Sequence, residues 1–399
     1  MKLFPRTLKS ELLLAAKEFP AVTIFGPRQS GKTKLAQMSF PKKPYVSFEY
    51  TDIRNVALND PRAFLAQYKN GAILDEIQKA PELLSYLQGI LDKSNKSGMF
   101  ILTGSHQPEL HGAVAQSLAG RTAVLELYPF SLEETLDIPR ISKNVWELIF
   151  NGFFPRLLAK KIRPESFYRS YVATYLERDL QNIVQISDKP RFEKFLILLA
   201  SRVGQLIDYT SLSNDAGVSQ NTIKNWINAL KSLYLLFELL PWHSNVRRRL
   251  VKTPKLYFAD TGLAAYLMGI RDFQTLERHP LRGLLFENFV LMDLVKHEWN
   301  RGRKPSLYFF RDSIGNEVDI LWEQNGFYMP IEVKSAETFN ADFVKGILAF
   351  RNMVSETEFE KQLLPGMVIC NAEQKLSFKG VNVRNLMLNG GKFLYSLTK

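Results

Sequence analysis

A run of eight residues near the N-terminus has the spacing of a phosphate-binding loop, G-x-x-x-x-G-K-T. It consists of Gly26, Pro27, Arg28, Gln29, Ser30, Gly31, Lys32 and Thr33. Glycines let the backbone wrap around phosphate oxygens, while Lys32 would reach the β- and γ-phosphates and Thr33 would hold Mg²⁺. The apolar residues 21–25 indicate a buried strand before the loop, and residues 34–37 continue as a helix, as the motif requires. The alternative is a glycine-rich turn that binds nothing.

Two adjacent carboxylates, Asp75 and Glu76, follow another apolar segment. Carboxylates at the end of a buried strand are costly unless they serve a cation or a reaction. Downstream of a phosphate-binding loop, Asp75 would help to hold Mg²⁺ and Glu76 would polarise the attacking water. The alternative is that both residues only cap the next helix.

Two further side chains are candidates for contacts with a nucleotide. Ser105, with Thr103 as second choice, ends the next predicted strand, where it would sit between the γ-phosphate and the water. Arg121 precedes the last strand of this region, and its planar, permanently charged guanidinium suits a phosphate. An ordinary strand-to-loop turn is the alternative for Ser105, and a surface ion pair is the alternative for Arg121.

A second group of charged residues lies in the last third of the chain. Asp319 and Glu332 occupy corresponding points on two predicted neighbouring strands, and Lys334 shares a face with Glu332 because side chains alternate along a strand. Glu287, on an apolar helix, can reach the same place. This spacing resembles the PD-(D/E)XK nuclease fold, which implies that Asp319 and Glu332 bind Mg²⁺ or Mn²⁺ while Lys334 helps to activate water. Salt bridges alone, or a fold that only binds, are the alternatives.

The elements that must position the first group alternate between strand and helix. Apolar segments typical of strands occur at residues 22–25, 45–48, 72–74, 99–102 and 123–127. This alternation predicts an α/β fold with a parallel sheet, helices on both of its faces, and a ligand site at the carboxyl ends of the strands.

The middle of the chain predicts a helix-turn-helix. Residues 208–232 contain a short helix, a turn at Gly217 and a second helix that Ser219 can cap. The exposed positions of the second helix would be Gln220, Asn221, Lys224, Asn225 and Asn228. Strands at 235–240 and 255–258 would form a wing, and the basic loop Arg247-Arg248-Arg249 between them would touch a DNA backbone. The alternative is a winged helix used only for packing or protein contact.

Several of these motifs together resemble a prokaryotic family of AAA-type ATPases. The motifs are GPRQSGKT at 26–33, LDEIQ at 74–78, FILTGS at 100–105 and SLAGR at 117–121. The resemblance implies ATP binding and hydrolysis with the roles given above to Lys32, Thr33, Asp75, Glu76 and Ser105. Members of this family end in a domain of uncertain function that is itself similar to the nuclease fold.

The resemblance also implies an α/β multidomain arrangement. We predict an AAA-type P-loop core at 1–140, a helical lid at 141–200, a winged helix-turn-helix at 201–270 and a PD-(D/E)XK-like α/β domain at 280–399. The turn at 151–155 departs from the family pattern, since Asn151 stands in place of a glycine. The Asp260-Thr261-Gly262 segment is interpreted as a structural turn and helix cap.

Composition limits the remaining choices. The 399 residues carry a net charge of +12, and residues 141–280 contribute +8 of it, with 20 Lys and Arg against 12 Asp and Glu. This excess is a weak pointer to nucleic acid, and a solvated basic surface is the alternative. No apolar run is long enough for a membrane span. The single cysteine fits a reducing cytoplasm, where we expect the protein to be located.

The sequence therefore predicts an ATP-hydrolysing, Mg²⁺-dependent, DNA-associated protein, with metal-dependent DNA cleavage by the last domain as an added hypothesis. The rival hypothesis is a regulatory or defence-type ATPase whose last two domains bind only protein. AAA-type cores often need an arginine from a neighbouring copy, so a homo-oligomer is an expected partner, and Arg121 is left open to action in cis or in trans.

Overall fold

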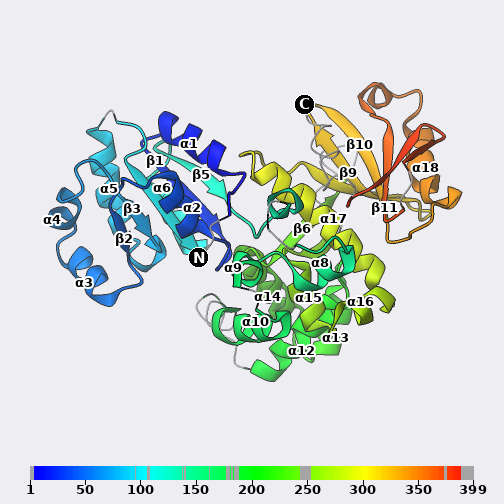
Figure 1. Ribbon diagram of the computed structural model, residues 1–399, viewed down its shortest axis with the longest axis horizontal. Helices are drawn as coiled ribbons and strands as arrows, with labels where there is room; N and C mark the ends of the chain where they lie inside the picture. The colour runs from blue at the N-terminus through cyan, green and yellow to red at the C-terminus, as the bar shows by residue number, and fades with distance from the viewer. Residues whose placement is uncertain are drawn as a thin grey trace.

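The computed structural model describes residues 4–94, 96–105, 108–136, 138, 141–160, 162–176, 180, 183, 188–242, 253–372 and 375–387. In Figure 1 a parallel sheet (blue and cyan) occupies one end of the molecule, a mixed sheet (orange and red) the other, and a largely helical region (green) lies beside both. The basic loop at 247–249, which the sequence associates with DNA, lies outside the described residues.

The first sheet confirms the predicted parallel α/β core. Its strands, in spatial order β2-β3-β4-β1-β5, are all parallel. They are β1 (Ala21–Gly26), β2 (Tyr45–Ser47), β3 (Ile73–Asp75), β4 (Phe100–Ser105) and β5 (Thr122–Glu126). β1 and β4 are buried along their whole length because helices cover both faces of the sheet.

Two separate apolar clusters line the two faces of this sheet. On one face, α1 (Lys9–Glu18) and α2 (Lys32–Ser39) pack their apolar sides against side chains of β1, β3, β4 and β5. On the other, α5 (Leu83–Asp92) and α6 (Pro108–Ser117) pack against the alternate side chains. The remaining elements here are α3 (Thr51–Asn59), α4 (Pro61–Ala66) and the 3-10 turn η1 (Ile77–Lys79).

The middle of the chain is largely helical, and Asp260 links several of its segments. It contains α7 (Leu132–Thr135), α8 (Val145–Asn151), α9 (Pro155–Lys160), α10 (Pro164–Tyr171), α12 (Lys189–Ala200), α15 (Thr261–Leu267) and α16 (Phe273–Arg278). As predicted, Asp260 caps α15, accepting from the Leu263 amide at 3.1 Å. It also accepts from the Phe153 amide at 2.7 Å and the Tyr168 hydroxyl at 2.6 Å, and thereby ties three segments together.

The helix-turn-helix is present at the predicted place. It consists of α13 (Tyr209–Ala216), left-handed Gly217 and α14 (Gln220–Ser232), with Ser219 accepting from the Thr222 amide as the cap. The predicted positions Gln220, Asn221, Lys224, Asn225 and Asn228 are all exposed. The strands β6 (Leu236–Pro241) and β7 (Lys255–Phe258) form the antiparallel pair that follows.

The second sheet extends beyond the predicted last domain. Its order is β12-β13-β11-β10-β9-β8-β6-β7, because β6 pairs with β8 through Leu240–Tyr308 and Pro241–Phe309. The other strands are β8 (Leu307–Arg311), β9 (Glu317–Gln324), β10 (Phe327–Lys334), β11 (Gly366–Cys370), β12 (Leu376–Phe378) and β13 (Val381–Asn385). Both strands of the predicted wing thus belong to one sheet with the last third of the chain.

A long helix connects the halves of the molecule. α17 (Arg282–Trp299) is buried from Leu285 to Glu298, and it joins the main apolar cluster, which runs from the first sheet to the second. α18 (Lys345–Val354), η4 (Ala341–Val344) and η5 (Glu358–Gln362) complete the C-terminal layer. The helix predicted at 167–186 is confirmed up to Leu176, with the difference that α10 ends at Tyr171 and continues as a π-helical turn, Val172–Leu176.

Candidate functional site

The glycine-rich loop joins β1 to α2 at the carboxyl edge of the parallel sheet. Gly26 has φ +151°, and a Cβ there would lie 2.1 Å from the Leu127 carbonyl oxygen, so only glycine fits. Gly31, at φ +98°, precedes α2 and provides no side-chain cap, which leaves the first-turn amides of that helix facing any bound anion. The ammonium of Lys32 donates to the carbonyls of Gly26 and Pro27, both at 2.9 Å, so it lies across the loop where phosphates would bind.

The Asp75 carboxylate is the centre of a hydrogen-bond network next to this loop. Oδ1 accepts from Thr33 Oγ1 at 2.7 Å and from Thr103 Oγ1, and Oδ2 accepts from the Tyr45 hydroxyl at 2.8 Å. Burial first, and then the Asp75 charge, raise the pKa of Tyr45 well above its ordinary value, so this hydroxyl stays a donor. Thr33 and Asp75 therefore present adjacent oxygens, a donor set that fits Mg²⁺ held with a nucleotide.

Glu76 and Ser105 meet through a residue to which the sequence assigned no role. The Gln78 side-chain amide donates to the Glu76 carboxylate and, at 2.8 Å, to Ser105 Oγ. Ser105 is paired with Gly26 across the β1–β4 ladder, so it lies between the loop and Glu76. Glu76 has left-handed backbone angles (φ +57°, ψ +47°), a strained state for a non-glycine residue that is common at functional sites. The sequence indicated this contact only through the position of Gln78, two residues after Glu76.

Arg121 lies at the opposite edge of the sheet. It precedes β5, whose first residue pairs with Ala21 at the start of β1, about 17 Å along the strand from Gly26. Its guanidinium forms a bidentate contact with Asp92, with Nη2 at 3.1 Å from Oδ2. Arg121 therefore cannot reach a phosphate in its own loop, because the parallel strands separate the two ends of the sheet.

The predicted residues of the last domain do lie together. Lys334 Nζ is 2.6 Å from Glu332 Oε1 and 3.4 Å from Asp319 Oδ2. Asp319 Oδ2 also accepts from the Val333 amide at 2.8 Å. Antiparallel pairing of β9 with β10 brings the two carboxylates to the same point, as the strand pattern predicted.

A second cation, which the sequence analysis missed, enters this cluster from β7. Lys255 Nζ is 2.6 Å from Glu317 Oε1 and 3.4 Å from Glu287 Oε1. The Tyr257 hydroxyl donates to the same Glu287 oxygen at 2.5 Å. Lys255 and Tyr257 are two residues apart and so share a face of β7, which was the only signal in the sequence.

Glu287, Glu317, Asp319 and Glu332 form a carboxylate cluster in which burial and neighbouring charge shift the pKa values of Glu287 and Glu332. Burial, followed by the nearby Asp319 charge, raises the pKa of Glu287 to about 7 and that of Glu332 to about 8. Burial by itself lowers the pKa of Lys255, but the surrounding carboxylates outweigh it and hold the pKa above its ordinary value. The amine is therefore charged at neutral pH.

The predicted Mg²⁺ or Mn²⁺ at this cluster stays a prediction, because one oxygen of each of three carboxylates is already paired, whereas Glu332 Oε2 is buried and has no hydrogen-bond partner. Asp319 Oδ2, Glu332 Oε1 and Glu287 Oε1 each already contact an ammonium or a hydroxyl donor. Within the described part of the chain, no group of three or more His, Cys, Asp or Glu side chains is placed to hold a metal ion. Lys255 and Lys334 already place positive charge beside these carboxylates.

Comparison with known proteins connects this geometry to a family. An AAA domain model matches residues 18–136, a domain of unknown function (DUF8612) matches 142–274, and another (DUF4143) matches 282–388. An uncharacterized protein of Mycobacterium tuberculosis is 30% identical over 335 residues, covering 84% of this chain and 74% of its own. The chain belongs to this family of AAA-type ATPases with a C-terminal DUF4143 domain.

More distant similarities extend the comparison. A Haemophilus influenzae protein is 23% identical over 340 residues, which is 79% of this chain and 82% of its own. The Walker-type ATPase of Pyrococcus abyssi has a TM-score of 0.44 at 16% identity, covering 66% of this chain and 96% of its own. The ORC2 protein of Aeropyrum pernix has a TM-score of 0.30 at 16% identity, covering 58% of this chain and 84% of its own. No described helix is long and apolar enough to cross a membrane.

Proposed function

We propose that this chain binds ATP at residues 26–33 and hydrolyses it. The observation that carries the proposal is the 2.7 Å contact between Thr33 Oγ1 and Asp75 Oδ1, because it joins the glycine-rich loop to the strand-end carboxylate expected in an ATPase. Mg²⁺, when bound with ATP, neutralises charge on the phosphates.

The protein's own residues have separate roles in this proposal. Lys32 binds the β- and γ-phosphates with the ammonium that now contacts two loop carbonyls. Glu76 orients and polarises the attacking water, and Ser105 lies between that water and the phosphate. Gln78 holds Glu76 and Ser105 at a fixed separation, because its amide donates to both.

Turnover and nucleotide binding by variants of the full chain test this proposal. Glu76→Gln is expected to bind ATP normally and to lose turnover, whereas Lys32→Ala is expected to weaken both. Lys17→Ala, which removes an exposed lysine from α1, is the control and should resemble the wild type. Normal turnover in Glu76→Gln would contradict its role. Unchanged ATP affinity in Lys32→Ala would contradict the nucleotide site itself.

Arg121 has a place in the proposed function only between copies of the chain. Arg121 lies too far from its own loop to contact a nucleotide bound there. It could act only on the nucleotide of a neighbouring copy, which requires a homo-oligomer. Mixing catalytically inactive Glu76→Gln with Arg121→Ala tests this idea. In mixed oligomers, an intact loop can meet an intact arginine, so turnover should exceed that of either variant alone. No recovery, despite measured oligomers, would contradict it.

We further propose that α14 contacts double-stranded DNA. Five polar side chains of this helix are exposed along one side, and residues 141–280 carry most of the net positive charge. Amide and ammonium groups on the second helix of a helix-turn-helix suit base edges and phosphates. The competing hypothesis, in which this surface binds a protein partner, predicts no salt-dependent DNA affinity.

The carboxylate cluster favours a binding or structural role over cleavage. One oxygen each of Glu287, Asp319 and Glu332 is paired with Lys255 or Lys334, so a metal ion would have to compete with these ammonium groups for its ligands. Incubation of labelled linear, nicked and branched DNA with Mg²⁺ or Mn²⁺ tests this view, using wild type beside Asp319→Ala. We expect no cleavage by either protein. Cleavage by the wild type that is lost in Asp319→Ala would establish the nuclease that the sequence suggested.

A further inference from the structure

Arg6, in the segment before α1, contacts the glycine-rich loop from outside. The residue is 7% exposed, and each nitrogen of its guanidinium donates a hydrogen bond. Nη1 donates to the Ser30 carbonyl at 2.6 Å, Nη2 to the Tyr128 carbonyl at 2.7 Å, and Nε to Glu134 Oε1 at 2.9 Å. One buried side chain therefore joins the loop to the segment after β5.

The contact with Ser30 fixes the orientation of a peptide unit in the loop. In a trans peptide the C=O and the following N–H point in opposite directions. Because Arg6 holds the Ser30 carbonyl outward, the Gly31 N–H points to the other side, into the loop. Gly31, at φ +98° and ψ +17°, has no side chain to restrict this peptide, so an external contact is needed to hold it.

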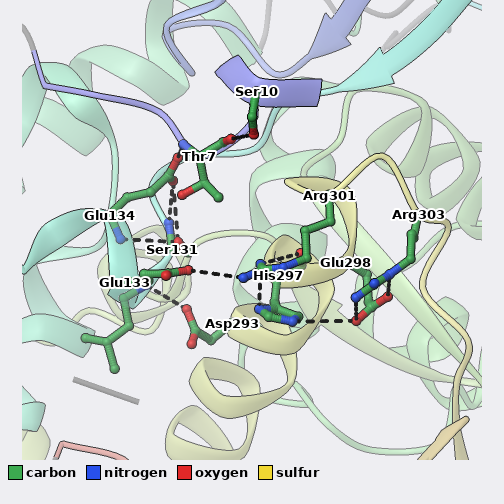
Figure 2. Close-up of polar contacts among 11 residues, drawn as sticks. Thr7, Ser10, Ser131, Glu133, Glu134, Asp293, His297, Glu298, Arg301 and Arg303 are labelled. Atoms are coloured by element: carbon green, nitrogen blue, oxygen red, sulfur yellow. Dashed lines mark hydrogen bonds and ion pairs between the residues drawn. The ribbon is translucent and has the colours of Figure 1, made fainter. Parts of the chain in front are cut away.

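The position of Arg6 is itself fixed by a buried carboxylate. Glu134, 6% exposed, also accepts from the Thr7 amide at 2.8 Å and from the Ser131 amide at 3.0 Å. Ser131 accepts from the Glu134 amide, which completes a capping box at the start of α7. Figure 2 shows this group of contacts, with Thr7 above Glu134 and Ser131.

The capping box is held from its other side by α17. Asp293 Oδ1 accepts from the Leu132 amide at 2.6 Å, and Lys296 Nζ donates to the Phe130 carbonyl at 3.1 Å. Arg301, just beyond the helix, lies 3.8 Å from the Glu133 carboxylate (Figure 2). Glu134 is therefore a rigid anchor, and Arg6 cannot shift without breaking buried contacts.

We propose that Arg6 is a positioning residue of the nucleotide site, one that turns the Gly31 amide toward the phosphate next to it. The inference rests on the proposed function, since it concerns the same loop. It differs from the roles of Lys32 and Thr33, because Arg6 acts through the backbone and does not touch the nucleotide. The phosphate concerned is the β-phosphate, around which loops of this type wrap.

Nucleotide affinities of Arg6→Lys in the full chain test this proposal. Lysine keeps the charge but cannot donate to three diverging acceptors, so the Ser30 carbonyl loses its partner. We expect ADP affinity to fall about tenfold, the effect of one well-oriented hydrogen bond to a charged group. AMP lacks the β-phosphate, so its affinity, measured by competition with a fluorescent nucleotide, should stay unchanged. Melting without nucleotide, compared with the wild type, reports on folding.

Two further variants sharpen the test. Arg54→Lys is the matched control, since Arg54 also donates to a backbone carbonyl, that of Phe48 at 3.3 Å, and should bind ADP normally. Glu134→Gln keeps an acceptor for Arg6 and should lose less ADP affinity than Arg6→Lys. Should Arg6→Lys fail to fold, Glu134→Gln carries the same ADP and AMP comparison with a smaller expected difference.

The outcomes separate this inference from the proposed function. A parallel loss of ADP and AMP affinity in Arg6→Lys would mean that the residue only maintains the fold. Unchanged ADP affinity would mean that the Gly31 peptide needs no outside contact, and either result overturns the inference alone. Failure of the wild type to bind ADP or ATP would instead overturn the proposed function, and the inference with it.

Discussion

Lys255→Met should destabilise the protein in a strongly pH-dependent way. The lysine side chain is 6% exposed and contacts Glu287 and Glu317. Glu317 is 28% exposed and lies 3.7 Å from Arg311, so it keeps a cation and access to water. Glu287 would keep only the hydroxyl of Tyr257. Removing one partner of a buried ion pair typically costs about 3–5 kcal/mol, and we expect about 3 kcal/mol at pH 8.5.

The sign of the pH dependence follows from the pKa of Glu287. Its value in the folded protein, about 7, exceeds that of an exposed glutamate, so its contribution to stability is fully present in acid and is lost as the pH rises through 7. Loss of Lys255 raises this pKa further, so the penalty continues to grow above pH 7. At pH 5.5 Glu287 is protonated in both proteins, and the difference should shrink to about 1 kcal/mol, a typical cost of a buried substitution.

Thermal unfolding at pH 5.5, 7.0 and 8.5 measures this difference. A loss of about 3 kcal/mol corresponds to a melting temperature about 6–12 °C lower for the unit that unfolds. The double variant Lys255→Met/Glu287→Gln removes both charges and should regain most of the loss at pH 8.5. Lys361→Met removes an exposed ion pair with Glu358 and should show no measurable shift. Equal losses at all three pH values, or no loss at all, would refute the electrostatic account of the cluster.

Three other variants test separate features. Gln78→Ala should lower kcat about tenfold, because Glu76 loses one restraining hydrogen bond, and should leave ATP affinity unchanged. An unchanged kcat in steady-state assays would show that Gln78 has no role in the site. Glu332→Gln should flatten the fall in melting temperature between pH 6 and 9, because its pKa of about 8 lies above the unfolded value and stability is lost as the pH rises through it. A slope equal to that of the wild type would contradict this. Lys224→Glu, on exposed α14, should weaken DNA binding and reduce the slope of log affinity against log salt by about 1, and an unchanged slope would exclude this residue from the contact.

Local patterns in the sequence predicted much of the fold. The five parallel strands, the glycine loop and the helix-turn-helix appear where apolar runs, turn residues and caps predicted them. In the helix predicted from residue 167 the π-helical turn at Val172–Leu176 was not foreseen, because aromatic spacing does not distinguish it from an α-helix. Pairing of β6 with β8 was also not foreseen, since strands so far apart in the chain carry no local signal of their contact.

Some residues of the candidate sites could likewise be predicted from local motifs, whereas others could not. Lys32, Thr33, Asp75 and Glu76 belong to short motifs, so their roles follow from spacing along the chain. Arg121 also lies in a motif, but its place at the far edge of the sheet depends on strand direction and length, which no motif states.

The sequence by itself determined the phosphate-binding loop, the strand-end carboxylates and the alternation of strands and helices, because each depends on residues a few positions apart. Only the tertiary structure decided that Arg6 holds the Ser30 peptide and that Lys255 enters the carboxylate cluster. Arg6 is separated from Ser30 by 24 residues, and Lys255 from Glu287 by 32. Such contacts form only when sheets and helices pack, since packing brings buried charges together and excludes the water that would otherwise solvate them.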